Sequence, residues 1–255
     1  MHHATIHVIL ALAAIEDLHL QSVDISHAFI DSEIDTEVYM AQPVGFVQHG
    51  SEYVCKLSKS IYGLKQSPRL WSEKLGAAMK ELGFTKGYSD PSLYIHDKDN
   101  IKVIVPVFVD DITLASASNE ALDKFVVELT TYFKLRDLGP TSLFLGVEIK
   151  RNRAEHTIYL SQCQYILQKL DEFSMTDSKP VGTPMDPGFK LSNEQCPRTS
   201  EDKAEMKNIP YINAVRSILY LALLTRPDIP YTASILARFN SNPGMIHWRA
   251  VKHLF

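Results

Sequence analysis

Residues 101–114 read IKVIVPVFVDDITL, and this stretch decides the fold. Apolar, mostly β-branched residues flank the adjacent carboxylates of Asp110 and Asp111, so we expect two buried strands joined by a tight turn at the acidic pair. Two ionised carboxylates side by side are costly to bury unless a cation lies between them. Upstream, the expected strand 20–25 carries Asp24 near its end. Three carboxylates form the oxygen-only ligand set that Mg²⁺ prefers, so Asp24 is the natural third ligand.

An ordinary surface turn is the competing interpretation of the acidic pair. Asp-Asp sequences are common in turns, because the Asp side chain hydrogen-bonds to nearby backbone groups. The dipeptide alone favours such a turn, so the surrounding sequence has to decide between a turn and a metal site.

Further sequence blocks lie in order along the chain around this hairpin. They are VDISHAF (23–29), EVYMAQPVGF (37–46), KLSKSIYGLKQSPRLW (56–71), FVDD (108–111), LGPTSLFLGVEI (138–149), KPVGTPM (179–185), YINAVRSILYLALLTRPDI (211–229) and HWRAVKHL (247–254). A single block would be weak evidence, but the ordered series is strong. In this order the chain resembles the reverse transcriptases of copia-type (pseudovirus) LTR retrotransposons, almost from end to end.

The resemblance implies an α+β fold. A polymerase palm, built as a ferredoxin-like split βαβ antiparallel sheet with helices on one face, is expected to precede a thumb and connector region rich in helices. The expected divisions are residual fingers and palm at 1–140, a primer-grip hairpin and thumb helix at 141–178, a linker at 179–209 and a helical connector at 210–255. Most of the family's fingers and its ribonuclease H domain have no counterpart in these 255 residues.

Hydrophobic periodicity predicts the order strand, helix, strand, strand, helix, strand that a split βαβ arrangement requires. The two helices are expected to begin at the N-caps Ser67 and Asn119, because short polar side chains are favoured there. Pro106 is expected to distort the hairpin, because proline removes a backbone donor from its strand. Trp71 begins a set of apolar residues at helical spacing in the first of these helices, so it is expected in the core. Further helices are expected at 211–224 and 227–239.

The resemblance implies an RNA-directed DNA polymerase that transfers nucleotides from deoxynucleoside triphosphates to a primer 3′ end with two metal ions. It assigns catalysis and metal binding to Asp24, Asp110 and Asp111, with Mg²⁺ as the cofactor and Mn²⁺ as a substitute. Asp24 and Asp110 are expected to hold both ions, and Asp111 to support one ion or the primer end. The carbonyl of Ile25 is expected to complete the shell of one ion.

Further binding roles follow from the same resemblance. The nucleotide and template side is assigned to Ile25, Phe29, Tyr62, Gly63, Lys65 and Arg69, and the primer side to Phe108, Phe144, Leu145 and Gly146. Phe29 is expected beneath the nucleotide sugar, where its ring would exclude a 2′-hydroxyl, although its spacing fits a core phenylalanine equally well. Strand pairing alone would likewise explain residues 144–146.

The charge of the chain is acidic overall and basic in one segment. A formal net charge of −4 argues against the strong basic field of a processive nucleic-acid enzyme. Between residues 53 and 70, however, there is no acid, and the segment carries a basic strip made of Lys56, Lys59, Lys65 and Arg69. This strip fits a phosphate backbone, and it fits an ordinary solvated face about as well.

Cysteine spacing and hydropathy limit the compartment and the partners. Cys55, Cys163 and Cys196 are widely spaced, which indicates a reducing compartment and no zinc site. The apolar run at 7–15 is too short for a membrane span, which needs about 20 residues. The resemblance implies an RNA or DNA template-primer, deoxynucleoside triphosphates and other polyprotein domains as partners, and no membrane is expected. The expected location is the cytoplasm, in a virus-like particle, or the nucleus.

Two alternatives to a working polymerase remain open on the sequence. The first is a catalytically silent retrotransposon-derived fragment that binds nucleic acid or a protein partner, which the acidic net charge favours. The second is a metal-dependent phosphatase or nuclease. Only the carboxylates support the second alternative, and it ranks below the others.

Overall fold

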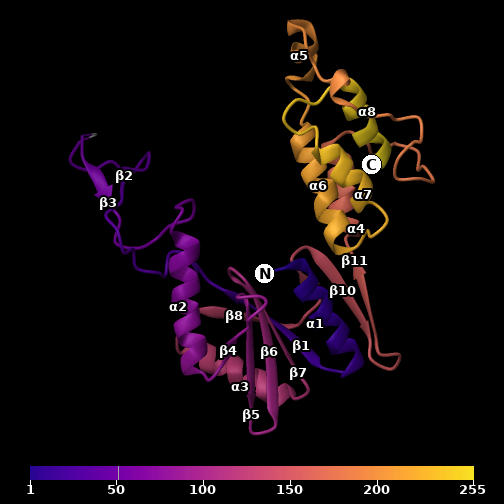
Figure 1. The fold of residues 1–255 in the computed structure, drawn as a ribbon. Helices are drawn as coiled ribbons and strands as arrows, with labels where there is room; N and C mark the ends of the chain where they lie inside the picture. The colour runs from indigo at the N-terminus through magenta and orange to yellow at the C-terminus, as the bar shows by residue number, and fades with distance from the viewer. Residues whose placement is uncertain (51) are drawn as a thin grey trace. The chain divides into compact units, whose positions relative to one another are not determined.

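The computed structural model describes residues 1–50 and 52–255, which form two compact units (Figure 1). The first unit comprises Met1–Leu145 and Lys150–Ile158, and the second comprises Gly146–Ile149 and Tyr159–Phe255. Each unit has a hydrophobic core of its own. None of the described helices is long and apolar enough to cross a membrane.

A six-stranded sheet forms the centre of the first unit. Its strands are β1 (His19–Ile25), β4 (Thr85–Lys86), β5 (Leu93–Lys98), β6 (Ile101–Phe108), β7 (Asp111–Ser116) and β8 (Leu135–Pro140), in the order β4-β5-β6-β7-β1-β8. Helix α2 (Ser67–Glu81) lies between β1 and β6 in the sequence, and α3 (Asn119–Thr130) lies between β7 and β8. The order β8-β1-β7-β6 is that of a split βαβ unit, as the sequence predicts.

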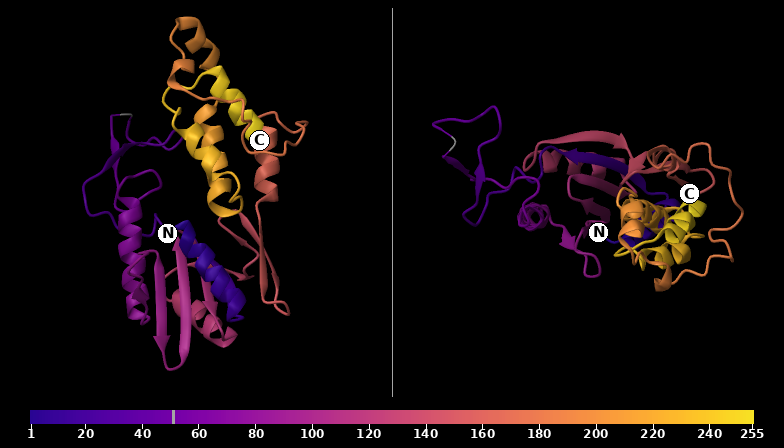
Figure 2. Two further views of the ribbon diagram at one scale, coloured as in Figure 1. Left: turned by 45° about the vertical axis from the view of Figure 1, so that its right-hand side comes forward. Right: turned by 90° about the horizontal axis from the view of Figure 1, so that it is seen from above.

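Helices cover both faces of this sheet (Figure 2). On one face, Val105 and Leu114 belong to a single core with residues of α2 and α3. Ile104 and Ala115 point to the other face and are also buried, and helix α1 (His3–Ile15) contacts β6 and β7. The prediction of helices on one face only is therefore wrong. The alanine- and leucine-rich α1 is apolar enough to cover the second face.

β6 and β7 form the predicted hairpin, whose two-residue turn is 109–110, with Asp111 as the first residue of β7. Phe108 pairs with Asp111 directly across the turn, and Ile104 pairs with Ala115 further along in the same register. Pro106 lies between these two pairs, inside a strand that has neighbours on both sides. The register is the same on both sides of the proline, but Val105 and Pro106 form no pair with β7, so the ladder between the two strands is interrupted there without a shift.

Both predicted N-caps lie one residue too late. The N-cap of α2 is Gln66, and the hydroxyl of Ser67 instead donates to the carbonyl of Ile61 at 2.6 Å. The N-cap of α3 is Ser118, whose hydroxyl accepts the backbone N–H three residues further on, rather than Asn119. Several polar residues adjoin each helix start, and contacts with the preceding loop decide which one becomes the cap.

The remaining elements are a small hairpin, a second small sheet and the helices of the second unit. Strands β2 (Tyr39–Ala41) and β3 (Val54–Lys56) pair with each other, and β9 (Leu143–Phe144), β10 (Val147–Asn152) and β11 (Thr157–Ser161) form a sheet in the order β11-β10-β9. The helices are α4 (Cys163–Glu172), η1 (Asn193–Gln195), α5 (Ser200–Met206), α6 (Tyr211–Leu224), α7 (Pro230–Ala237) and α8 (Met245–Leu254). The core of the second unit forms largely between α6, α7 and α8.

Candidate active site

The three predicted catalytic carboxylates meet at one end of the six-stranded sheet. Strand β1 lies directly beside β7, and its Asp24 is the register partner of Asp111. Asp110 lies in the turn just before Asp111, and its backbone carbonyl accepts the N–H of Ile25 at 3.1 Å. Register partners project from the same face of a sheet, so β1 and the hairpin bring the Asp24 and Asp111 side chains together.

The three carboxylates place negative charge at one end of the sheet, where Arg136 on β8 is the register partner of Asp24. Desolvation, followed by the charges of Asp110 and Asp24, raises the pKa of Asp111 above its usual value. Desolvation also raises the pKa of Tyr62, with the Asp110 charge as the next cause. Among the ion pairs of residues 1–50 and 52–255, none includes Asp24, Asp110 or Asp111. A cation would therefore be attracted to this end of the sheet.

These carboxylates fit a divalent metal by their chemistry. Their oxygens are hard donors of the kind that Mg²⁺ prefers, and the raised pKa of Asp111 marks a charge that a cation would stabilise. Within the described part of the chain, however, no three His, Cys, Asp or Glu side chains stand close enough to form a ready-made metal cage. The register of β1 and β7 places Asp24 beside Asp111, with Asp110 in the adjoining turn.

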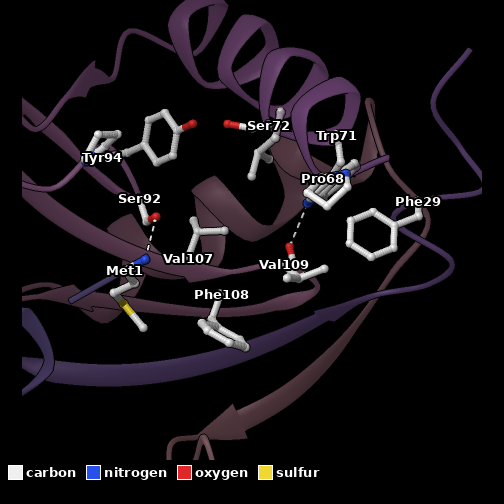
Figure 3. Close-up of a pocket in the computed structure, with 12 residues that line it drawn as sticks. Met1, Phe29, Pro68, Trp71, Ser72, Ser92, Tyr94, Val107, Phe108 and Val109 are labelled. Atoms are coloured by element: carbon white, nitrogen blue, oxygen red, sulfur yellow. Dashed lines mark hydrogen bonds between the residues drawn. The ribbon is translucent and has the colours of Figure 1, made fainter. Parts of the chain in front are cut away.

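The turn that carries Asp110 has an unusual backbone. Val109 has φ of 60°, in the left-handed region that a β-branched residue rarely adopts. The indole N–H of Trp71, on α2, donates to the Val109 carbonyl at 2.8 Å (Figure 3). The sequence places Trp71 in the core, which is correct, because its side chain is buried. A buried indole N–H needs an acceptor, so the sequence could have predicted that Trp71 makes a hydrogen bond, although not which group accepts it.

Two aromatic residues adjoin the carboxylates. The rings of Phe29 and Tyr62 meet edge to face with centroids 4.9 Å apart, and the Tyr62 hydroxyl lies 3.4 Å from Oδ2 of Asp110. Phe29 is half-buried and packs against the core, so it is at once a core residue and a wall of the site. Phe108 is 45% exposed beside the turn. The predicted Phe29, Tyr62 and Phe108 therefore lie near the carboxylates.

A pocket of about 190 Å³ lies between α2 and the hairpin (Figure 3). Apolar side chains form most of its wall, among them Phe29, Trp71, Tyr94, Val107 and Phe108. Its lining includes no Asp, Glu, Lys or Arg side chain. The pocket therefore suits the uncharged parts of a ligand whose charged part lies at the carboxylates.

The predicted basic strip is partly neutralised in the fold. Arg69 pairs with Glu73 at 3.0 Å and also with Asp35, and hydrogen bonds to these two carboxylates raise its pKa. Lys56 pairs with Glu37, which lies just before β2. Lys65 is exposed and takes part in no ion pair among the described residues. The acids that pair with Arg69 and Lys56 lie outside residues 53–70, so the sequence of that segment did not reveal these ion pairs.

The other residues predicted to contact nucleotide or primer differ in burial and in backbone conformation. Gly63 has φ of 98° with open space where a Cβ would be, so its backbone conformation rather than crowding favours glycine. Phe144 is buried. Leu145 and Gly146 follow it with φ of 49° and 70°, as a left-handed turn between β9 and β10.

Comparison with known proteins identifies the family. A family model described as "Reverse transcriptase (RNA-dependent DNA polymerase)" matches residues 1–187. This chain belongs to the reverse transcriptase family. The resemblance found in the sequence blocks is thereby confirmed.

The relatives of this reverse transcriptase chain come from transposons. The retrovirus-related Pol polyprotein from transposon TNT 1-94 of Nicotiana tabacum is 41% identical over 250 residues, which cover 97% of this chain and 19% of the polyprotein. The corresponding polyprotein from transposon RE1 of Arabidopsis thaliana is 35% identical, over 98% of this chain and 16% of the polyprotein. A putative transposon Ty5-1 protein of Saccharomyces cerevisiae is 32% identical, over 91% of this chain and 73% of its own length. The chain thus spans less than a fifth of the two plant polyproteins.

Proposed function

We propose that this chain is the RNA-directed DNA polymerase domain of a retrotransposon Pol polyprotein, which adds deoxynucleotides to a primer 3′ end on a template strand. The observation that carries the proposal is the register of β1 with β7, which pairs Asp24 with Asp111 and leaves Asp110 in the adjoining turn. Family membership and the retained carboxylates support it.

The protein's part in this reaction is to position charge. Asp24 and Asp110 would hold two Mg²⁺ ions, or Mn²⁺ in their place, and such ions clamp the attacking and leaving oxygens of a phosphoryl transfer. The hydrogen bond from Ile25 to the Asp110 carbonyl ties the two ligand-bearing segments together. Asp111 would support one ion or the primer end. Positioning and charge neutralisation account for most of the catalysis in phosphoryl transfer, so each segment's placement matters.

The aromatic pair beside Asp110 supports deoxynucleoside triphosphates as substrates. A nucleotide whose phosphates meet ions at Asp110 would place its sugar near Phe29, which contacts Tyr62 at a centroid distance of 4.9 Å. A ring at that position leaves no room for a 2′-hydroxyl. The backbone of Gly63 and the uncommitted ammonium group of Lys65 would serve the template side.

The remaining divisions of the chain are proposed from the family. The split βαβ sheet would be the palm, residues 141–178 the primer grip and thumb, 179–209 a linker and 210–255 the connector. Phe108 is exposed enough to contact a primer end. Phe144 is buried, so a primer contact in that segment would come from the turn at 145–146. Other domains of the polyprotein would be partners, in a virus-like particle in the cytoplasm or in the nucleus.

A catalytically silent fragment is not favoured. The three carboxylates expected for catalysis are present, and β1 and the hairpin gather them at one end of the sheet. The acidic net charge, which supported this alternative, includes the charge of the site itself.

The decisive experiment is Mg²⁺-dependent extension of a labelled DNA primer on an RNA template by the purified chain. The test variant is Asp110→Asn, which keeps the side chain's size and removes its charge. We expect extension by the wild type and none measurable by the variant. The matched control is Asp97→Asn, an exposed carboxylate on β5 that pairs with Lys102 at the end of β6 away from the turn, and this variant should extend normally. A folded wild type that does not extend a primer would overturn the proposal.

A further inference from the structure

The backbone at Val109 has to be held in place by something outside the turn. Phe108 and Asp111 are paired, so Val109 and Asp110 alone make the reversal between β6 and β7. At φ of 60°, the branched Val109 side chain crowds its own backbone, a conformation that glycine adopts freely. Without an external contact, this turn would relax and carry Asp110 with it.

Two consecutive carbonyls of the turn are each held by a donor from another element. The carbonyl of Val109 accepts the indole N–H of Trp71 at 2.8 Å, and the carbonyl of Asp110 accepts the backbone N–H of Ile25 at 3.1 Å. The two donors lie on α2 and β1, so the turn is fixed from two elements; Figure 3 shows the first of these bonds, from Trp71 to Val109. The Trp71 ring is itself buried, and it meets the Phe133 ring edge to face at 5.2 Å.

We propose that Trp71 is a positioning residue of the active site, and that its indole N–H, rather than its bulk, keeps the strained turn in the conformation that presents Asp110 and Asp111. Trp71 acts through the Val109 carbonyl. The effect of Trp71 on catalysis rests on the proposed polymerase function. Its effect on the conformation of the turn is independent of that function.

The first test measures the turn without metal or substrate. Because the Ile25 amide donates to Asp110, its hydrogen exchange, followed by NMR, reports whether the turn stays in place. In Trp71→Phe, which removes the donor and keeps a ring, this exchange should become at least about tenfold faster, as expected when a hydrogen bond is lost. In Phe133→Leu, which loses the packing partner and keeps the donor, it should stay near the wild-type rate.

The strain itself can be removed as a second test. Val109→Gly takes the left-handed conformation without steric cost, so Trp71→Phe in the Val109→Gly background should accelerate Ile25 exchange much less than in the wild type. If Trp71→Phe does not fold alone but folds in that background, the proposal also stands. Equal acceleration in both backgrounds, equal acceleration by Phe133→Leu, or failure to fold in both backgrounds would show that Trp71 is only a core residue.

The catalytic consequence is measured separately. In primer extension, Trp71→Phe should lower kcat by about 10- to 100-fold, the scale expected for misplaced catalytic groups, with little change in the KM for the nucleotide. The Mg²⁺ concentration for half-maximal rate should rise, and Val109→Gly should restore part of the loss. A rise in KM with unchanged kcat would contradict the positioning role. A wild type without activity would sink the polymerase proposal alone, because Ile25 exchange would still decide the role of Trp71.

Discussion

The two units of this chain use their polar groups in opposite ways. In the first unit, Asp24, Asp110 and Asp111 gather without a basic partner among the described ion pairs, beside a strained backbone at Val109. In the second unit, the Tyr211 hydroxyl donates to a carbonyl of the neighbouring helix at 2.8 Å. The carboxylate arrangement is unfavourable for stability and suits binding a cation, whereas the tyrosine arrangement joins two helices.

This difference predicts that the two units respond differently to substitution. Removing charge at the carboxylate end should change activity and leave folding intact, because like charges repel there. Removing packing or a hydrogen bond in the helical core should change folding and leave the chemical step intact. Each prediction below tests one side of this contrast.

Neutralising Asp24 should have the largest effect. Asp24→Asn removes a proposed metal ligand at constant size, and we expect the rate of primer extension to fall by roughly a thousandfold or more. The urea midpoint should stay constant or rise, because the repulsion with Asp111 is relieved. The control is Asp228→Asn in the second unit, whose exposed carboxylate pairs with Arg226. A similar rate loss in the control, or a destabilised Asp24→Asn, would break the contrast.

Truncating a core leucine of the second unit should have the next largest effect. Leu236 on α7 is fully buried, and Leu236→Ala should lower the free energy of unfolding by about 2–5 kcal/mol in urea denaturation. Leu223→Ala on α6, where the side chain is 51% exposed, is the control and should change little. Single-nucleotide addition by the folded fraction of Leu236→Ala should keep its wild-type rate. A slower chemical step would mean that the second unit also shapes the active site.

The hydroxyl of Tyr211 should contribute about 1 kcal/mol, the usual net value of a buried hydrogen bond. Tyr211→Phe removes the bond to the carbonyl of Leu236 and keeps the ring. The matched control is Tyr231→Phe, because that side chain is 74% exposed. Urea denaturation of both variants measures the difference. Equal midpoints for the two variants would show that the hydroxyl bond does not stabilise the second unit.

Local pattern was enough to predict the elements that carry the site. The apolar, mostly β-branched residues on both sides of Asp110 and Asp111 predicted two strands and the turn between them, and the structure has both. The apolar spacing from Tyr211 predicted a helix over 211–224, which are the observed bounds of α6. These features depend on residues that are neighbours in the sequence, and periodicity reports such features directly.

Contacts between distant segments were not predictable in the same way. The sequence does not show that Arg69 meets Asp35, 34 residues away, or that α1 returns to the second face of the sheet. The spacing of Trp71 correctly placed it in the core, but the acceptor of its indole N–H depends on where α2 docks. The sequence therefore predicted the strands and the turn that carry the three carboxylates, and the structure was needed for the contacts that position them.

Proton binding should have the smallest effect on the free energy of unfolding. Acidification should destabilise the folded second unit through His247 and stabilise the folded first unit through Asp111. Burial lowers the pKa of His247 below 6.5, so the folded second unit binds this proton more weakly than the unfolded chain does. Its contribution to stability is complete above pH 6.5 and is lost as the pH falls toward the lowered folded pKa. Desolvation and neighbouring charges raise the pKa of Asp111 above 3.8, so its contribution is complete below pH 3.8 and is lost as the pH rises through the raised folded pKa.

Urea midpoints recorded across the acid and neutral range separate these two contributions. His247→Gln, whose side-chain oxygen can still accept the N–H of Gly244, should flatten the loss of stability on the acid side. Asp111→Asn should instead raise the stability at neutral pH, because it removes the carboxylate that is destabilising when ionised. Only the first variant should change the unfolding of the second unit. If both variants shift the same part of the pH profile in the same direction, the assignment of the acid-side loss to His247 and of the neutral-side loss to Asp111 is wrong.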